Sequence, residues 1–292
     1  MQGCRVTMRE FRHRVFGTNT VPDEVWMDSA DDALELGNEW SRLLQIVSWL
    51  HAHPRPGVYL RQVDIPGVHS KFIEAYRGVL TELLDLVLPP EAVDAMASGA
   101  SQFALRYGFR DKPLRIRFRM LDPEHARLAT GPEQDITLDA ASFARLDPGI
   151  TRVFVTENEI NFLAFPKIKD SLVIFGAGYG FEMLAQASWL ARCQLHYWGD
   201  IDTHGFASLD QLRAQFDHVE SFLMDRATLL AFEPQWGEEA MQSLRELPRL
   251  KPEERALYDD LRDNRLRKRL RLELEKIGFH WVESALSKDF GR

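Results

Sequence analysis

The second half of the chain alternates between short apolar segments and helical ones, and this pattern limits what it can fold into. Apolar runs occur at TRVFVT, SLVIF, QLHYWG and VESFLMD. The segments between them, ENEINFLAF, FEMLAQASWLARC and DIDTHGFASLDQLRAQF, are expected to form helices. Short apolar strands separated by helices indicate a parallel sheet that is covered on both faces. Residues 151–292 are therefore predicted to form an α/β domain that binds ligands beyond the carboxyl ends of its strands.

The first half of the chain has a different pattern, and a chain of 292 residues is expected to form two domains. We predict a helix over 41–52, a short strand over 58–65 and a long amphipathic helix over 71–88 that ends at two prolines. This order is the outline of a winged-helix-like, α+β DNA-binding domain, placed at 41–125.

Two further segments complete the predicted division. Residues 1–40 are taken as an N-terminal extension with a helix that begins near Ser29. Residues 126–150, rich in Pro, Gly, Asp and Ala, are taken as a connector with a short helix.

Charge and cysteine content narrow the class of protein. The 36 basic and 44 acidic residues give a formal net charge of -8, which argues against coating nucleic acid by bulk charge but allows a local basic groove. Cys4 and Cys193 lack the spacing of metal ligands, which fits a reducing bacterial cytoplasm. No apolar run approaches the roughly 18 residues that span a bilayer, so no membrane contact is expected.

Three acidic residues follow two of the expected strands. Glu157 comes directly after the first strand of the α/β half, and Asp200 and Asp202 come directly after the third. Ile201 lies between the aspartates, so both carboxylates can turn to one side. Hard divalent cations prefer such oxygen ligands and stabilise charge on a phosphate that is being displaced. The pattern predicts a site for one or two Mg²⁺ or Mn²⁺ ions.

The same residues allow other interpretations. Each acidic residue could instead cap a helix, as Asp202 could for a helix starting near His204. The GAGYGF sequence suggests a dinucleotide site, but Phe181 stands where the fingerprint has its third glycine. DIDTH is similar to the nucleophile loop of haloacid-dehalogenase phosphatases, which normally has Thr at the position of His204. A G-x-S-x-G elbow, expected of Ser-His-Asp hydrolases, is missing.

Basic residues mark possible paths for DNA. In LRIRFRM, Arg115, Arg117 and Arg119 alternate with apolar residues, which predicts either a solvated face of an edge strand or a stripe that contacts phosphates. Arg61 and Lys71 are further candidates for DNA binding. A charged run near the C-terminus is more typical of a solvated helix face. It contains Arg262, Arg265, Arg267, Lys268, Arg269 and Arg271.

The motifs RQVDIPGVHSKFIE, LRIRFRMLDP, VFVTENEINFLAFP, YWGDIDTHGF and SFLMDRATL together resemble the JetD family, the nuclease subunits of Wadjet plasmid-defence systems. This family is similar to the A subunit of topoisomerase VI, which pairs a winged-helix domain with a Toprim domain. The resemblance implies a homodimer that works with an SMC-type ATPase complex (JetABC-like) and cuts both strands of DNA.

The resemblance also implies roles for particular residues. Glu157 matches the Toprim glutamate, which acts as an acid/base or metal ligand, and Asp200 and Asp202 match the metal-binding aspartates. Glu159 matches a position that is often acidic, and His204 and Gly205 belong to the same motif. Family members usually carry a longer N-terminal region and read RLEQE where this chain reads RLELE, with Leu274 in place of Gln.

The expected function is a Mg²⁺- or Mn²⁺-dependent endonuclease that hydrolyses closed circular double-stranded plasmid DNA. Tyr59, Tyr76 and Tyr107 could in principle supply a covalent nucleophile, but none stands in a matching motif, so water is expected. The alternatives are a DNA-binding or dimerisation module without chemistry, and a dinucleotide enzyme built on GAGYG.

Overall fold

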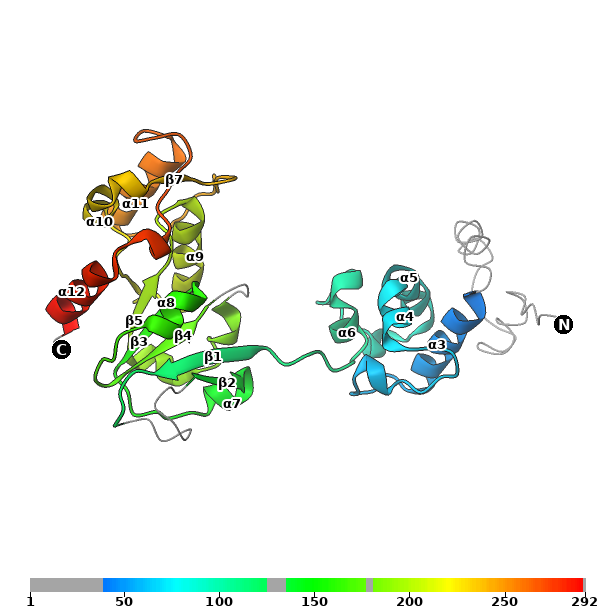
Figure 1. Ribbon diagram of the computed structural model, residues 1–292. Coiled ribbons are helices and arrows are strands. Elements are labelled where there is room, and N and C mark those ends of the chain that lie inside the picture. The colour runs from blue at the N-terminus through cyan, green and yellow to red at the C-terminus, as the bar shows by residue number, and fades with distance from the viewer. Residues whose placement is uncertain (1–38, 125–134, 177–180, 291–292) are drawn as a thin grey trace. The chain divides into compact units, whose positions relative to one another are not determined.

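The computed structural model describes residues 39–124, 135–176 and 181–290. It divides into two compact units, Met1–Lys112 and Pro113–Arg292, which are described separately (Figure 1). The helix expected near Ser29 and most of the GAGYG sequence lie outside the described residues.

The N-terminal unit is helical in the part that the structure describes. Its helices are α3 (Trp40–Ala52), α4 (Ser70–Ala75), α5 (Arg77–Val87) and α6 (Phe103–Arg106). The helix predicted over 71–88 is interrupted at Tyr76, which ends α4 and precedes α5. The strand predicted over 58–65 is wrong: Leu60–Gln62 form a 3-10 turn, η2, beside one isolated bridge between Tyr59 and Arg110. The winged-helix outline is therefore not confirmed.

The C-terminal unit is built on a mixed six-stranded sheet. From one edge to the other the strands are β2 (Asp135–Asp139), β1 (Arg115–Met120), β4 (Ser171–Phe175), β3 (Arg152–Thr156), β5 (Gln194–Trp198) and β6 (Glu220–Ser221). Strands β4, β3, β5 and β6 run parallel, whereas β1 is antiparallel to both of its neighbours. The predicted α/β architecture with a largely parallel sheet is thus confirmed for this half.

Strand β1 lies in a different unit from the one that the sequence predicts. The sequence predicts that it belongs to the 41–125 domain, but it pairs with β2 and β4 and lies in the C-terminal unit, which begins at Pro113. Strands β2 and β4 come later in the chain, so the sequence pattern around β1 could not indicate that it pairs with them. The segment taken as a connector contributes strand β2 as well as the expected short helix, α7 (Ala140–Ala144).

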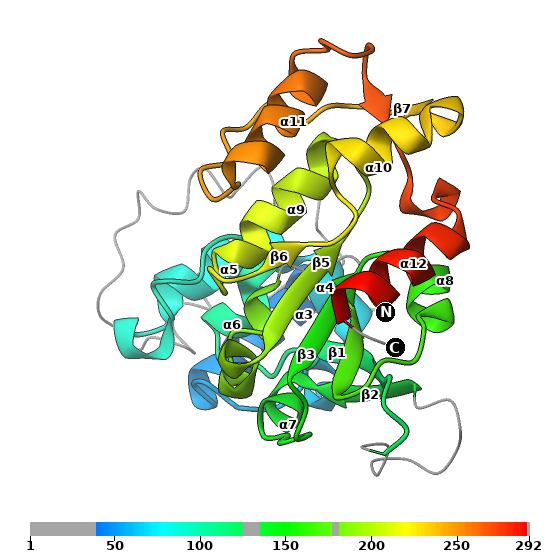
Figure 2. The ribbon, with the colours of Figure 1, turned by 90° about the vertical axis from the view of Figure 1, so that its left-hand side faces the viewer.

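Helices cover the two faces of this sheet. The register aligns Arg119, Val173, Phe154 and His196 in one row across four strands, so these side chains share a face. Phe290 of α12 (Phe279–Phe290) contacts Phe154 and His196 on that face, and α12 lies across the sheet in Figure 2.

The opposite face carries α7 and a 3-10 turn. Phe143 of α7 packs between Phe118 of β1 and Trp189 of η6 (Ser188–Arg192). The single helix expected over 181–193 is instead formed by two 3-10 turns, η5 (Phe181–Met183) and η6.

The remaining C-terminal elements include the tail, where the charged pattern over 253–286 predicts one long helix. They are α8 (Glu159–Ala164), α9 (Thr203–Arg213), α10 (Arg226–Ala231), η7 (Glu233–Gln235), β7 (Gly237–Glu238), α11 (Pro252–Arg262), β8 (Leu270–Arg271) and η8 (Leu274–Lys276), in addition to α12. The charged pattern over 253–286 therefore contains two helices with a strand and a 3-10 turn between them. Within the described residues, no helix combines the length and apolar composition needed to cross a membrane.

His196 makes the stability of this unit depend on pH. Its ring lies between Phe154 and Phe290, and burial lowers its pKa from 6.5 to about 4. The unfolded chain therefore takes up the proton first, so stability is complete above pH 6.5 and falls as the pH drops toward 4. The expected loss in the free energy of unfolding is at most about 3 kcal/mol, because His196 is only partly buried. Denaturant melts at pH 7 and pH 4.5 should show this loss in the wild type and a smaller one in His196→Phe.

The exposed His280 provides the control for that prediction. The His280→Phe variant should keep the pH dependence of the wild type. An equal loss of stability in His196→Phe and the wild type would contradict the assignment to His196.

Candidate functional site

The carboxylates predicted from the strand ends lie at one edge of the sheet. Strands β3 and β5 are parallel neighbours, and Thr156 pairs with Trp198 at their last residues. Glu157 follows the first strand, and Asp200 and Asp202 follow the second, so all three open into one pocket of about 610 Å³. This pocket is strongly acidic: its lining also includes Glu239, Glu273 and Glu275.

Asp200 is fixed by the C-terminal segment that contains β8. Its Oδ1 accepts a hydrogen bond from Leu274 N at 2.8 Å, and its Oδ2 accepts one from Arg271 Nη2 at 2.5 Å. Both partners come from residues more than 70 positions later in the chain. The β3–β5 edge alone therefore does not complete the site.

Asp202 has two contacts, one structural and one in the pocket. Its Oδ1 accepts from Gly205 N at 2.7 Å and caps α9, as the helix-cap interpretation expected. Its Oδ2 lies 3.2 Å from Arg271 Nε. Burial raises the pKa of Asp202 to about 6, and the nearby charges of Glu239 and Asp200 add to the rise, while the Gly205 and Arg271 contacts oppose it. Asp202, which is 3% exposed, therefore caps α9 with Oδ1 and presents Oδ2 to the pocket.

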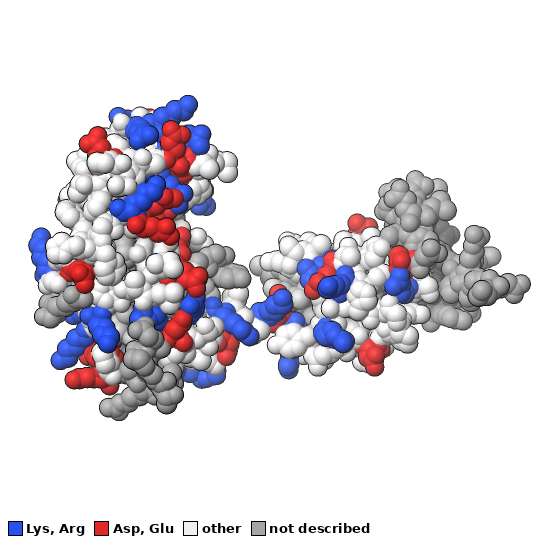
Figure 3. Space-filling model, in the orientation of Figure 1, with Lys and Arg blue, Asp and Glu red and all other residues white. Residues whose placement is uncertain are grey.

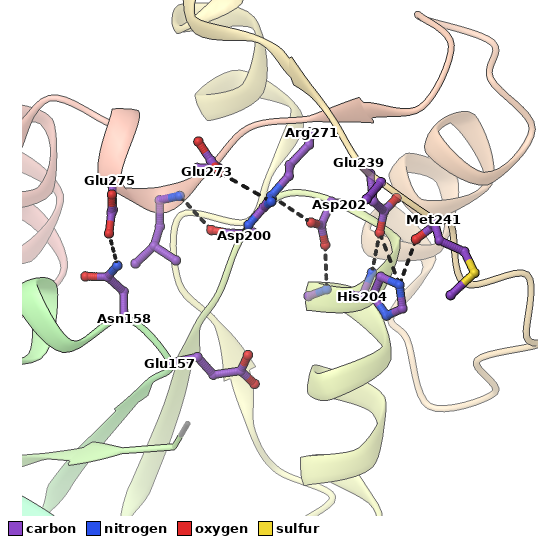
Figure 4. A pocket seen from close by; sticks show the side chains of 13 residues that line it. Glu157, Asn158, Asp200, Asp202, His204, Glu239, Met241, Arg271, Glu273 and Glu275 are labelled. Atoms are coloured by element: carbon purple, nitrogen blue, oxygen red, sulfur yellow. Dashed lines mark hydrogen bonds and ion pairs between the residues drawn. The ribbon is translucent and has the colours of Figure 1, made fainter. Parts of the chain in front are cut away.

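Glu157 lies apart from the aspartates within the same pocket. Tyr197 Oη donates a hydrogen bond to Glu157 Oε1 at 3.0 Å. Burial raises the pKa of Glu157, and the Asp200 charge adds to this, whereas hydrogen bonds from Tyr197 and Ser208 lower it. Figure 4 shows its carboxylate on the opposite side of the pocket from the cluster around Arg271.

His204 and Gly205 lie at the start of α9, beside the aspartates. His204 lines the pocket, and its Nε2 is 2.8 Å from Met241 O. Its backbone N–H donates to Glu239 Oε1 at 3.2 Å, a buried carboxylate that also accepts from Thr203 Oγ1 at 2.8 Å. A Cβ on Gly205 would lie 2.1 Å from Asp200 O, so the helix can approach the Asp200 loop only with glycine at this position.

Only some of the acidic side chains of the pocket lie together in a way that suits a divalent cation. Asp200 and Asp202 already share one cation, the Arg271 guanidinium, which shows that the pair is arranged to hold positive charge. The Glu157 carboxylate lies on the opposite side of the pocket from this guanidinium. Across the described residues, no group of three or more His, Cys, Asp or Glu side chains is arranged to hold a metal ion. The aspartate pair with Leu274 N holding Oδ1 in place is the part of the site that fits a metal.

The arginine stripe of β1 differs from the expectation. Arg115 is exposed, but Arg117 forms ion pairs with Asp135, at 2.7 Å, and with Glu159. Arg119 is buried, and its Nη1 donates to Phe162 O at 2.7 Å. The reason is that β1 lies inside the sheet and α8 covers this face. In this structure only Arg115 of the three is open to a phosphate.

Glu159 and the other basic candidates can also be placed. Glu159 pairs with Arg117 and does not line the pocket. Arg61, in η2, and Lys71, in α4, are exposed on the N-terminal unit. On the face of the C-terminal unit that Figure 3 shows, blue and red side chains are interleaved, so that face offers no continuous basic surface.

Several pocket residues were not singled out as site residues from the sequence. Arg271 and Glu239 lie in the pocket, as do Glu273 and Glu275, the two acids of RLELE. Asn158 caps α8 through Oδ1 and its side-chain amide contacts Glu275. Two sequence signals indicate this segment: the RLELE motif, and the charged run near the C-terminus that includes Arg271.

The comparisons with known proteins agree with the motifs. The family model described as Wadjet protein JetD, C-terminal, matches residues 108–286. A second model, described as an uncharacterized protein conserved in bacteria, N-terminal (DUF3322), matches residues 33–85. No curated protein matches the chain. Since the first match spans more than half of the sequence, the chain belongs to the family of the Wadjet protein JetD.

Proposed function

We infer that the chain is a Mg²⁺- or Mn²⁺-dependent endonuclease with a Toprim-type site, and that it cleaves closed circular double-stranded plasmid DNA. The observation that carries this proposal is the meeting of Glu157, Asp200 and Asp202 at the ends of two neighbouring parallel strands, in one acidic pocket. Membership of the JetD family supports a role in a Wadjet defence system, as a homodimer that works with an SMC-type ATPase complex.

The pocket supports hydrolysis by water. A divalent ion bound at Asp200 and Asp202 would offset the negative charge that builds on a phosphate during in-line displacement. Glu157, whose carboxyl is partly buried and accepts a hydrogen bond from Tyr197, would accept a proton from water or return one to the leaving oxygen.

The tyrosine alternative is weakened by the environment of Tyr107. Its ring is fully buried, and its hydroxyl donates to Asp85 Oδ1 at 2.6 Å and lies 3.0 Å from Thr81 O. Burial raises the pKa of Tyr107. A hydroxyl held in this way is a poor nucleophile, which favours water.

The proposal is tested by incubating closed circular plasmid with the purified chain and Mn²⁺, with EDTA as the metal-free control. Asp200→Asn should lower the cleavage rate about 10²-fold or more, because the remaining aspartate would hold the ion poorly. Asp217→Asn, which changes a fully exposed carboxylate, should cleave at the wild-type rate. Cleavage that persists in EDTA, or in Asp200→Asn, would contradict the proposal.

A second candidate is a DNA-binding or dimerisation module without chemistry. The Asp202–Gly205 cap and the Arg271 ion pairs favour it, because they give both aspartates a purely structural role. Calorimetry with Mn²⁺ separates the two candidates: binding that is lost in Asp200→Asn supports the nuclease, and no binding by the wild type supports the module.

A further inference from the structure

The C-terminal segment 270–275 is attached to the aspartate loop by backbone hydrogen bonds. Ile201 N donates to Leu272 O at 2.9 Å, and Leu272 N donates to Ile201 O at 3.1 Å. Both side chains are completely buried. Because alternate residues of an extended strand point to opposite sides, the neighbours of Ile201 and Leu272 point the other way, into the pocket. This alternation places Arg271 against Asp200 and Asp202.

The Arg271 guanidinium lies at the centre of a carboxylate cluster. Nη2 is 2.5 Å from Asp200 Oδ2, Nε is 3.2 Å from Asp202 Oδ2, and Nη1 is 3.3 Å from Glu273 Oε1. Figure 4 shows the guanidinium between the two aspartates, and a dashed line joins it to Glu273 as well. One monovalent cation therefore neutralises the oxygens that would serve a divalent ion.

We propose that Arg271 is an internal cation that competes with the divalent metal for Asp200 and Asp202, and so holds the site in an inactive state until its side chain turns away. This inference rests on the proposed function, in which those two aspartates bind the metal. A Mg²⁺ ion needs oxygen ligands at about 2.0–2.1 Å and repels a guanidinium at close range. The ion and Arg271 therefore cannot occupy the space between the two Oδ2 atoms together.

The exchange requires only a side-chain movement. The backbone bonds between Ile201 and Leu272, and the bond from Leu274 N to Asp200 Oδ1, do not involve the guanidinium. They keep the aspartate loop in place while Arg271 leaves. Glu273, already in contact with Nη1, offers the displaced guanidinium a carboxylate partner on the same segment.

The test is calorimetric titration of the full chain with MnCl₂, which reads binding rather than activity. Arg271→Gln should bind Mn²⁺ about tenfold more tightly than the wild type, a change of about 1.4 kcal/mol from lost competition. Arg267→Gln is the matched control, since it removes an exposed arginine just before that segment, whose Nη1 donates a hydrogen bond to Trp236 O at 3.3 Å. Its affinity should stay at the wild-type value.

Thermal melting provides a second readout and a check of folding. In EDTA, Arg271→Gln should melt below the wild type, because Asp200 and Asp202 lose their counter-charge. Added Mn²⁺ should then raise its Tm by more than it raises that of the wild type. Should Arg271→Gln fail to fold, Arg271→Lys keeps the charge without the planar fork and should bind Mn²⁺ with intermediate affinity.

The outcomes separate this inference from the proposed function. Mn²⁺ binding that depends on Asp200 but is equal or weaker in Arg271→Gln overturns the competition and leaves the metal site standing. Tighter binding in both Arg271→Gln and Arg267→Gln also overturns it, because bulk charge would explain the gain. No Mn²⁺ binding by any variant overturns the proposed metal site and this inference together.

Discussion

Replacing Arg213 with alanine is expected to lower the free energy of unfolding by about 3–5 kcal/mol. Arg213 of α9 is 4% exposed, and its Nη2 donates to Glu254 Oε1 of α11 at 2.8 Å. Its Nε donates to Val219 O at 2.9 Å, just before β6. The side chain therefore joins two helices and an edge strand, and its loss leaves a buried carboxylate without its counter-charge.

The lowered pKa of Glu254 agrees with its hydrogen bonds from Arg213. Burial by itself raises the pKa of Glu254, but hydrogen bonds from Arg213, Ser221 and Lys251 N outweigh it and lower the pKa. A carboxyl with a lowered pKa contributes stability above its unfolded pKa and loses it as the pH falls through the folded value. The effect of Arg213→Ala should accordingly be largest near neutral pH.

Denaturant unfolding of Arg213→Ala and of Arg226→Ala provides the comparison. Arg226 forms a more exposed ion pair with Asp260, so its loss should cost less than about 1 kcal/mol. The double change Arg213→Met with Glu254→Leu should recover part of the lost stability, because no buried charge is left unpaired. Equal effects of Arg213→Ala and Arg226→Ala would contradict the structural role of the buried pair.

Adding one methyl group at Gly205 is expected to disrupt the candidate site. A Cβ there would lie 2.1 Å from Asp200 O and 3.1 Å from Asp200 C, which are backbone atoms that cannot turn aside. Either α9 or the Asp200 loop must move, and displacements of about 1 Å cost roughly 10²-fold in catalysis. Gly205→Ala should therefore lose Mn²⁺-dependent plasmid cleavage by about that factor and melt at a lower temperature.

Gly78→Ala is the control for this prediction. Gly78 lies in α5, and a Cβ there would meet nothing within 4 Å. Gly78 is the second residue of α5, where alanine gains at most the roughly 0.5–1 kcal/mol that it has over glycine inside a helix, so this variant should be at least as stable as the wild type and equally active. Wild-type cleavage and melting by Gly205→Ala would show that the loop tolerates the change and would contradict the close approach described here.

The acidic residues at the sheet edge could be predicted from the sequence because each lies close along the chain to the strand that positions it. Glu157 follows β3 directly, Asp200 and Asp202 lie within four residues of the end of β5, and parallel strands with apolar sequences bring their carboxyl ends together. Arg271 and Glu239 come from segments far along the chain that reach the pocket through loops and a two-stranded β7–β8 sheet. A pattern within a short stretch of sequence does not indicate contacts between distant segments. Arg271 and Glu239 could therefore not be assigned to the pocket from the sequence.

The three arginines of β1 show the limit of what an alternation of polar and apolar residues can predict. Period-two alternation indicates a strand, but it does not say whether the polar face meets solvent. Strand β1 is paired on both edges, and α8 packs on the face that carries Arg119. Burial of an arginine is tolerated because backbone carbonyls such as Phe162 O accept its hydrogen bonds.

The proposed nuclease site is tested most directly by the cleavage of closed circular plasmid by Glu157→Ala and the wild type, side by side, with Mn²⁺. We expect a loss of roughly 10²–10⁴-fold in Glu157→Ala at unchanged melting temperature, the range attributed to one acid or base. Glu253→Ala, which changes an exposed carboxylate on α11, should cleave normally. Normal cleavage by Glu157→Ala would show that this pocket is not the catalytic centre.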